Sequence, residues 1–275
     1  ETGKDALSLT KDIKIPWELS RLQHLSVLGR AYEYTGDERY VQTFVNQVTQ
    51  WFDANNFLYG PNWVCPMEVG LRAINMIWAW HWLKRVETIP EVFWQRLVCS
   101  LYDHMIYLEH HWEIYDSITS NHYLSDLVGY LYLTHFFKDL AGMRAKQEWC
   151  VQELYAEMKK QVFEEGTDYE GSTSYHVLVA ELFYHAYVIM QANNVEIPPW
   201  FIERLHRMYT FIWWLCPGDD MSMMVRIGDH DSGTVLQYGV TWPLVKHLKI
   251  EPVSSTKEVH YSSFGVSIYK SIVRR

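Results

Sequence analysis

The 275-residue chain has 24 Lys and Arg against 33 Asp and Glu, a net charge of −9, and 48% hydrophobic residues, enough for a sizeable core. The acidic balance argues against nucleic acid as a partner, because no basic stripe is present to release counterions from phosphates. No uninterrupted apolar stretch reaches the ~18 to 20 residues that a membrane span needs. The chain begins with Glu and shows no signal peptide, so we expect a fragment or a processed product, whose start does not indicate a compartment.

The aromatic and cysteine residues narrow the function classes further. Aromatic residues make up 16% of the chain, and this surplus either lines a groove suited to sugar rings or packs helices together. The four cysteines are widely spaced and form no CxxC pair, which excludes zinc-ribbon and thioredoxin-type sites. We expect Cys99 and Cys150 to be buried thiols because both lie in apolar helical patterns; a disulfide is the alternative.

Helical patterns dominate the first 216 residues. A first-turn Pro16 and a stop at Gly36 bound the first predicted helix. The apolar periodicity predicts helices over residues 11–37, 37–56, 67–85, 91–114, 121–140, 143–166, 172–194 and 198–216. No fixed repeat is present, so successive hairpins predict a closed α/α toroid rather than a solenoid.

The pattern of apolar and polar residues changes after Cys216. Residues 221–239 read as short extended segments, 242–250 as a short helix and 263–273 as a strand. One or two strands are not stable alone in water. The sequence therefore predicts a mainly α fold: an incomplete (α/α) toroid over residues 1–216, then a β-rich segment over 217–275. This segment is either the start of a β-sandwich domain or an edge that packs on the toroid.

Two polar clusters precede or open early helices. Glu18, Arg21 and His24 are spaced three apart, which puts them on one face of the first predicted helix. Their ordinary interpretation is an ion pair on a solvated surface, and the functional one is a substrate contact.

The second cluster has Asn62 and Trp63 just before a helix that carries Glu68 and Arg72. The i,i+4 spacing of Glu68 and Arg72 also fits an ordinary intrahelical salt bridge.

A third cluster opens the helix predicted at residue 121. Ser120 or Asn121 suits the N-cap, so capping alone explains either residue. His122, just inside the helix, has its protonated form disfavoured by the helix dipole, which predicts a neutral imidazole usable as a base.

The fourth cluster opens the helix predicted at residue 172. Asp168 and Glu170 suit a helix N-terminus, and Ser172 or Thr173 suits the cap. Capping does not require the Tyr175 and His176 that follow in the first turn. We therefore expect this polar start to face a substrate, while the apolar remainder of the helix forms core.

Other polar motifs are weaker. A tight Asp/Gly turn explains Asp229, His230 and Asp231 better than a metal site does. The histidines at 104, 110 and 111 have no recognisable metal spacing. No GxSxG, HExxH, P-loop or dinucleotide fingerprint is present. We expect neither a metal nor a cofactor.

Taken together, these stretches resemble the N-terminal toroid of the heparinase II/III-like polysaccharide lyases. The matching motifs run in the family's order from residue 12 to about 233: "WELSRLQHL", "TGDERY", "NWVCPMEVGLRAIN", "SNHYLSDLVGYLYL", "EGSTSYHVLVAELF" and "IGDHDSG". The resemblance implies a toroid followed by an antiparallel β-sandwich, with an acidic polysaccharide held between them.

The resemblance also implies the chemistry. Family members cleave uronic-acid polysaccharides by β-elimination, in which an Asn neutralises the uronate carboxylate, a Tyr protonates the leaving oxygen and a His or Tyr removes the C5 proton. On this chain the catalytic positions fall on Asn121 with His122 and on Tyr175 with His176. The expected substrate-binding residues are Arg21, His24, Asn62, Trp63, Glu68, Arg72 and Glu170.

Two departures from the family pattern bear on this assignment. In the family a further catalytic His or Tyr comes from the β-domain, and this chain ends at Arg275, barely into that region. It also starts within the pattern, so we expect either a fragment or a shortened relative that uses His122 or His176 as base or is inactive.

Three functions compete. The first is a lyase on an acidic, uronic-acid-containing polysaccharide, and the second is a non-catalytic carbohydrate-binding or assembly protein of polysaccharide biosynthesis or export. A hydrolase needs two carboxylates across the site, for which Glu170 with Asp229 or Glu68 could serve. The family implies a periplasmic or secreted protein; a biosynthesis relative is equally compatible with the cytoplasm. The sequence does not indicate an oligomeric state.

Overall fold

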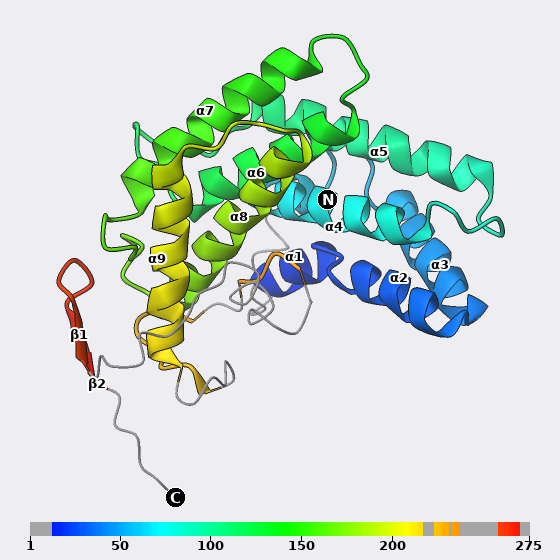
Figure 1. Cartoon of the computed structure of the whole chain (residues 1–275). Coiled ribbons are helices and arrows are strands. Elements are labelled where there is room, and N and C mark those ends of the chain that lie inside the picture. The colour runs from blue at the N-terminus through cyan, green and yellow to red at the C-terminus, as the bar shows by residue number, and fades with distance from the viewer. Residues whose placement is uncertain (1–12, 217–222, 231–232, 237–257, 270–275) are drawn as a thin grey trace, which may run out of the picture.

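The computed structural model describes residues 13–216, 223–230, 233–236 and 258–269 (Figure 1). The predicted helix at 242–250 and Asp231 lie outside these ranges. The helices are α1 (Lys14–Ser20), α2 (His24–Thr35), α3 (Glu38–Ala54), the 3-10 turn η2 (Pro61–Trp63), α4 (Pro66–Leu83), α5 (Glu91–His110), α6 (Asn121–Phe136), α7 (Met143–Gln161), α8 (Thr173–Ala192) and α9 (Pro199–Leu215). Among the residues described, no helix is both long and apolar enough to span a bilayer.

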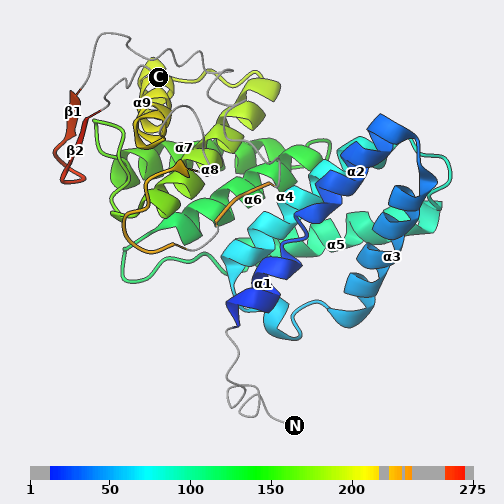
Figure 2. The ribbon, with the colours of Figure 1, turned by 90° about the horizontal axis from the view of Figure 1, so that it is seen from below.

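The helices form two layers of an incomplete ring, which confirms the mainly α, toroid-like prediction. Consecutive inner helices α2, α4, α6 and α8 contact one another, and each packs against the outer helix next to it in the chain. Residues 66–76 of α4 are buried on every side, whereas α3 buries a single stripe, as expected of inner and outer layers. Figure 2 shows the arc running from α2 and α3 to α8 and α9.

The closest approach within the inner layer is between α4 and α6. A Cβ atom placed on Gly129 would lie 2.4 Å from the Cα atom of Gly70, and one placed on Gly70 would lie 2.8 Å from the carbonyl oxygen of Ser125. Only glycines allow the two backbones to touch in this way. These two helices carry the N-termini on which the candidate site is built, so their contact fixes the spacing of that site.

The first predicted helix is wrong in one respect. The structure breaks residues 11–37 into α1 and α2, with Leu22 between them at φ +57°. The break turns Arg21 and Leu22 inward, so both are buried, and Glu18, Arg21 and His24 do not share one helix face. The end at Gly36, φ +66°, is as predicted.

Cysteine burial was predicted correctly at one of two positions. Cys150 is buried, but Cys99 lies exposed on α5, and Cys65 and Cys216 are buried. All four are free thiols, so the disulfide alternative is not realised. The outer face of α5 is mixed, with exposed Val98 and Tyr102 beside charged residues, which is why periodicity alone misplaced Cys99.

The crossing segment, defined here as residues 223–230 and 233–236, packs against the helices. Backbone N–H of Thr173 donates to Ile227 (2.9 Å), Asn75 Nδ2 donates to the Val235 carbonyl (3.0 Å), and Val235 N–H donates to Glu181 Oε2 (3.0 Å). The segment therefore joins α4 to α8, and Figures 1 and 2 show it in orange between the two ends of the arc.

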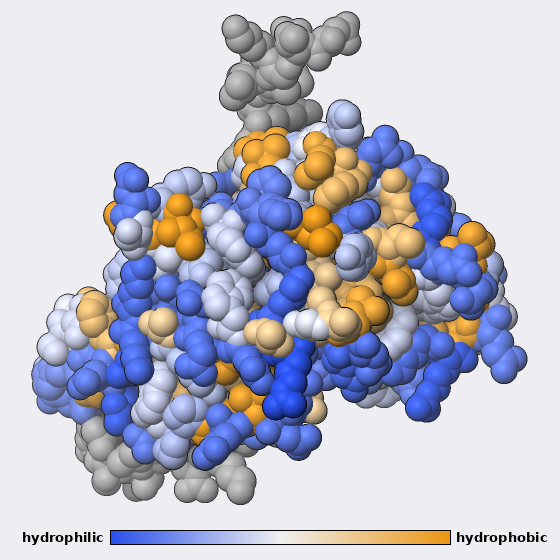
Figure 3. Space-filling view, turned by 90° about the horizontal axis from the view of Figure 1, so that it is seen from above, coloured by the Kyte–Doolittle hydropathy of each residue, from blue (hydrophilic) through white to orange (hydrophobic). Residues whose placement is uncertain are grey.

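A two-stranded antiparallel hairpin, β1 (Glu258–Tyr261) and β2 (Val266–Tyr269), follows. β2 confirms the strand predicted over 263–273. Tyr261 packs edge-on against Phe211 of α9, with ring centroids 4.6 Å apart. On the face seen from above, hydrophobic residues lie among hydrophilic ones (Figure 3).

Candidate active site

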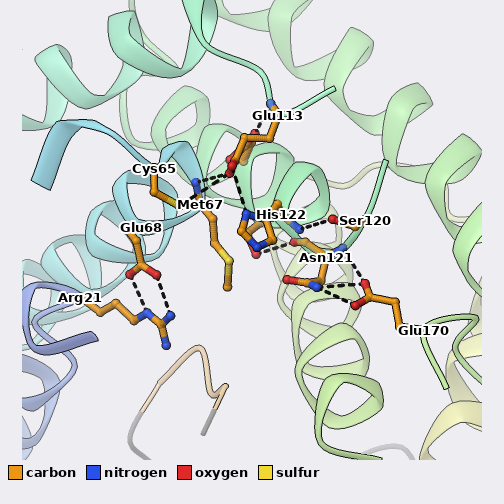
Figure 4. Close-up of polar contacts among 11 residues, drawn as sticks. Arg21, Cys65, Met67, Glu68, Glu113, Ser120, Asn121, His122 and Glu170 are labelled. Atoms are coloured by element: carbon orange, nitrogen blue, oxygen red, sulfur yellow. Dashed lines mark hydrogen bonds and ion pairs between the residues drawn. The ribbon is translucent and has the colours of Figure 1, made fainter. Parts of the chain in front are cut away.

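The candidate site lies where the N-termini of α4, α6 and α8 meet. Figure 4 shows hydrogen bonds at the starts of α4 and α6, with partners that include Glu113 and, from the loop before α8, Glu170. Helix N-termini carry partial positive charge and unpaired N–H groups, so this end of the arc suits acidic groups.

Asn121 is the first residue of α6, and Glu170 holds it from the loop before α8. Ser120, not Asn121, caps the helix, because the Ser120 hydroxyl accepts the His122 N–H. Asn121 Nδ2 lies 2.9 Å from each carboxylate oxygen of Glu170, and its backbone N–H donates to Oε1 at 3.0 Å. The Asn121 side chain is thus free of capping, and its buried amide already binds a carboxylate.

His122 is tied to Glu113, in the loop that follows α5. Its Nδ1 lies 3.0 Å from Glu113 Oε1, and 44% of its side chain is exposed. The hydrogen bond to Glu113 raises the pKa of His122 and outweighs the opposing effect of burial. This direction is opposite to the one predicted from the helix dipole, because a buried carboxylate faces the ring.

Glu113 is itself anchored, and sequence reasoning did not find it. Its Oε2 accepts the Met67 N–H at 3.0 Å and lies 3.9 Å from Cys65 Sγ, while its backbone N–H donates to Asp126 at 2.9 Å. Burial raises the pKa of Asp126 well above its usual value and that of Cys65 to about 12. Nothing in the local sequence marks Glu113, since its partners come from α4 and α6.

Arg21 and Glu68 form a two-point ion pair at the start of α4. Arg21 Nε and an Nη atom each lie 2.7 Å from a carboxylate oxygen of Glu68, and both side chains are buried. The alternatives of a surface ion pair for Arg21 and of an intrahelical pair between Glu68 and Arg72 are both wrong. Glu68 is neutralised by a residue 47 positions earlier in the chain.

Tyr175 lies in the first turn of α8 and is half-buried. The Ser172 hydroxyl accepts the N–H groups of Ser174 (3.2 Å) and Tyr175 (3.3 Å), which confirms Ser172 as the cap. Ser172 also donates to the carbonyl of Asp229 at 2.6 Å. The start of α8 is thereby fixed to the crossing segment, and Tyr175 is the third residue of the helix.

The family comparison decides the classification of this arrangement. The model of the heparinase II/III N-terminus matches residues 6–234, which is most of the chain. The chain belongs to this family. Curated relatives include heparin-sulfate lyases of Pedobacter heparinus, 24% identical over 72% of this chain, and of Bacteroides stercoris, 22% identical over 73%. The chain spans 30% and 33% of those relatives' lengths.

Solved structures show the same fold for this heparinase II/III domain. Heparan sulfate lyase HepC from Pedobacter heparinus superposes with a TM-score of 0.60 at 23% identity, covering 77% of this chain and 34% of that one. A structure described as heparinase III gives 0.60 at 22% identity, covering 72% and 30%. Here too the matched part is about a third of the relative.

His176 of this heparinase II/III domain is a core residue, which corrects its prediction as a catalytic group. It is fully buried; its Nδ1 accepts the Asp168 N–H, and its Nε2 donates to the Met208 carbonyl, both at 3.1 Å. Burial lowers the pKa of His176 to about 4. Both ring nitrogens are occupied, so His176 joins α8 to α9 as a neutral imidazole.

Arg72 and Trp63, predicted to bind substrate, lie in the core. Arg72 is fully buried, donates to His104 Nε2 and the Asn62 carbonyl (both 2.9 Å), and lies 5.3 Å from the Trp63 ring. Burial lowers the pKa of Arg72 to about 9. Asn62 Nδ2 donates to Asn55 at 2.7 Å. These residues therefore support the loop before α4 by contacts on its buried side.

Two further predicted positions are engaged elsewhere. His24, at the start of α2, has its Nε2 3.0 Å from Gln47 Oε1 and so links α2 to α3. The aromatic surplus mostly packs core, but Trp51 and Trp63 also line a cavity of about 340 Å³ between α3 and α5. Neither Asn121 nor Tyr175 lines that cavity.

One set of side chains in the described part of this heparinase II/III domain has metal-ligand character. Single donor atoms of Cys65, Glu113 and His122 all lie within 4.8 Å of one another. The sequence did not reveal this set, because its members are separated by 48 and 9 positions and follow no zinc motif.

Proposed function

We propose that this chain is the helical part of a lyase that cleaves a uronic-acid-containing polysaccharide by β-elimination, with Asn121 and His122 receiving the uronate carboxylate and Tyr175 protonating the leaving oxygen. In this assignment residues 1–216 are the toroid and 217–275 begin a β-domain. The arrangement of Asn121 and His122, each held by its own carboxylate, carries the proposal.

The carboxylate chemistry supports this proposal. The C5 proton of a uronate becomes acidic only when the charge of the neighbouring carboxylate is neutralised. Asn121 already donates to both oxygens of a carboxylate, that of Glu170. Nδ2 carries two hydrogens, so a bifurcated bond through one leaves the other for substrate. Donors held in place before the reaction stabilise the developing enolate-like charge without reorganising.

The half-exposed His122 beside Asn121 supplies the second contact. Its bond to Glu113 fixes the ring, which leaves Nε2 as the nitrogen that can meet a ligand. Tyr175 acts as a general acid and stays protonated until transfer, so its phenol requires no large pKa shift. Because His176 is buried, the group that takes the C5 proton falls, by the family resemblance, in the β-domain.

The hydrolase alternative is disfavoured by the same contacts. Hydrolysis requires one carboxylic acid and one carboxylate facing the sugar. Glu170 is bonded to Asn121, and Glu68 is paired with Arg21 at 2.7 Å. Both carboxylates therefore serve as partners of other side chains. Periplasmic or secreted placement of the protein is part of the proposal and follows from the family.

The experiment follows the ultraviolet absorbance of the C4–C5 double bond that elimination leaves on a uronate. Heparan sulfate, heparin, alginate, hyaluronan and a bacterial capsular extract form the panel. We expect absorbance to rise with one class of substrate and the rise to be lost in Tyr175→Phe, whose melting temperature should stay near that of the parent. Thermal stabilisation by the panel without any rise, in a protein that also carries the β-domain base, would indicate the carbohydrate-binding alternative instead.

A further inference from the structure

We propose that Cys65, Glu113 and His122 form a zinc site at the joint start of α4 and α6. The three donors are a thiol sulfur, a carboxylate oxygen and an imidazole nitrogen, which are the ligand types zinc takes in proteins. Figure 4 shows the three side chains turned toward one another from three separate elements. The inference concerns metal binding and stands whether or not the proposed reaction is correct.

The three donors lie close enough together to converge on one ion. Zinc lies about 2.3 Å from a thiolate sulfur and about 2.0 Å from imidazole nitrogen or carboxylate oxygen, so neighbouring ligand atoms are separated by roughly 3.3 to 3.5 Å. Here Glu113 lies 3.0 Å from His122 Nδ1 through one oxygen and 3.9 Å from Cys65 Sγ through the other. All three donor atoms lie within 4.8 Å of one another, so the side chains would draw together to reach these spacings around one ion.

The surroundings hold the ligands in place. Met67 N–H donates to Glu113 Oε2, and the Glu113 backbone is fixed by Asp126. Outer contacts of this kind orient metal ligands and sustain affinity. Cys65 is the N-cap of α4, and His122 is the second residue of α6, so two ligands sit on rigid helix starts and the third on an anchored loop.

The charge balance also favours a cation. Near Cys65 lie the side chains of Glu113, Glu68 and Asp126. Arg21 neutralises Glu68. Besides the Met67 N–H, the carboxylate of Glu113 faces the imidazole of His122 and the thiol of Cys65. A divalent cation would place positive charge beside these carboxylates, and it would convert the thiol to a thiolate ligand.

Three protein ligands is the number found in zinc sites that keep a fourth position open. The exposed part of His122 shows that the cluster borders solvent. Zinc and Glu113 would compete for the same ring nitrogen, Nδ1. Metal loading therefore changes how His122, the neighbour of Asn121, is held.

The test uses the full chain, reduced with a phosphine and purified without chelator. Zinc is titrated and counted per chain, and Co²⁺ serves as a spectroscopic probe. We expect one metal per chain and a thiolate-to-cobalt charge-transfer band in the near ultraviolet. Zinc should also raise the melting temperature, because it binds the folded state.

The matched pair of variants is Cys65→Ser and Cys99→Ser, each of which removes one thiol. Cys65→Ser should abolish the band and weaken zinc at least about tenfold, whereas Cys99→Ser, on the exposed face of α5, should change neither. Glu113→Gln, which keeps an acceptor for Met67 N–H, should also weaken zinc and guards against a folding defect in Cys65→Ser. Cobalt that binds without the band, or a band that survives in Cys65→Ser, would overturn the assignment.

Discussion

Arg21 and Glu68 are joined by two 2.7 Å contacts between buried side chains, although 47 positions separate them in the chain. The pair fastens the α1–α2 break to the first turn of α4. Removing one member leaves the other as a buried, uncompensated charge, which is far costlier than losing a surface pair.

Glu68→Gln should therefore lower the free energy of unfolding by about 3 to 5 kcal/mol, measured by chemical denaturation. The control is Glu148→Gln, whose partner Arg144 is 92% exposed, and whose loss should cost less than about 1 kcal/mol. Similar costs for both variants would contradict burial of the Arg21–Glu68 pair.

Gly129→Ala should destabilise the protein by about 1 to 3 kcal/mol or more, because the new Cβ meets the Cα of Gly70 at 2.4 Å. Helix propensity alone predicts the opposite sign, a gain of up to about 1 kcal/mol. Thermal and denaturant unfolding decide between the two, and a more stable variant would show that α4 and α6 are not in backbone contact.

Asp168 should make the stability of the protein depend on pH. It is buried, and burial together with the charge of Glu170 raises its pKa to about 7. The pKa of Asp168 is thus higher in the folded state than the unfolded value of about 3.9. The contribution of Asp168 to the free energy of unfolding is therefore complete below about pH 4 and is lost as pH rises through 7. His176, which accepts the Asp168 N–H, has a pKa of about 4, so it stays neutral over most of this window.

Asp168→Asn should remove that pH dependence, because an amide does not titrate in this range. The variant should still fold, since Asn can accept the Glu170 N–H as Asp168 does. Between pH 5 and pH 8 the stability of the parent should fall by about 2 to 3 kcal/mol more than that of the variant. The measurement is a set of urea titrations at both pH values. Parallel curves for parent and variant would show that Asp168 is ionised throughout.

Asn121→Ala tests the proposed carboxylate contact. Since Ser120 caps α6, the loss of Asn121 should affect catalysis more than folding. We expect kcat/KM on the uronate substrate to fall at least about a hundredfold and turnover of a carboxyl-reduced analogue to change far less. Equal losses on both substrates would assign Asn121 a structural role beside Glu170.

Much of the arc was predictable because its signals are local. Apolar periodicity marks the helices from α3 to α9, and Ser172 marks the start of α8. The break at Leu22 was missed because apolar residues continue through it at helical spacing, and the reason for the break, the contact of Arg21 with Glu68, lies in another helix.

The candidate site was predictable only in part. Asn121, His122 and Tyr175 stand out as polar residues at helix starts, but their partners do not. In the sequence Glu113 is an ordinary loop acid, and only the fold brings it to His122. This contact raises the pKa of His122, whereas the helix dipole alone predicts a lowered pKa. His176 looked catalytic because its sequence position next to Tyr175 conceals that successive residues of a helix point in different directions.

The crossing segment has a consequence for how the chain is made. Gln23 contacts Thr234, 211 positions later, and Asn75 and Glu181 both find partners at Val235. During synthesis the helical arc emerges from the ribosome before the crossing segment that joins its two ends, so these buried polar groups wait until that segment has been translated. A shortened version of the domain should therefore extend through residue 236, since ending it earlier removes these bonds of Asn75 and Glu181, at about 0.5 to 1.5 kcal/mol for each bond.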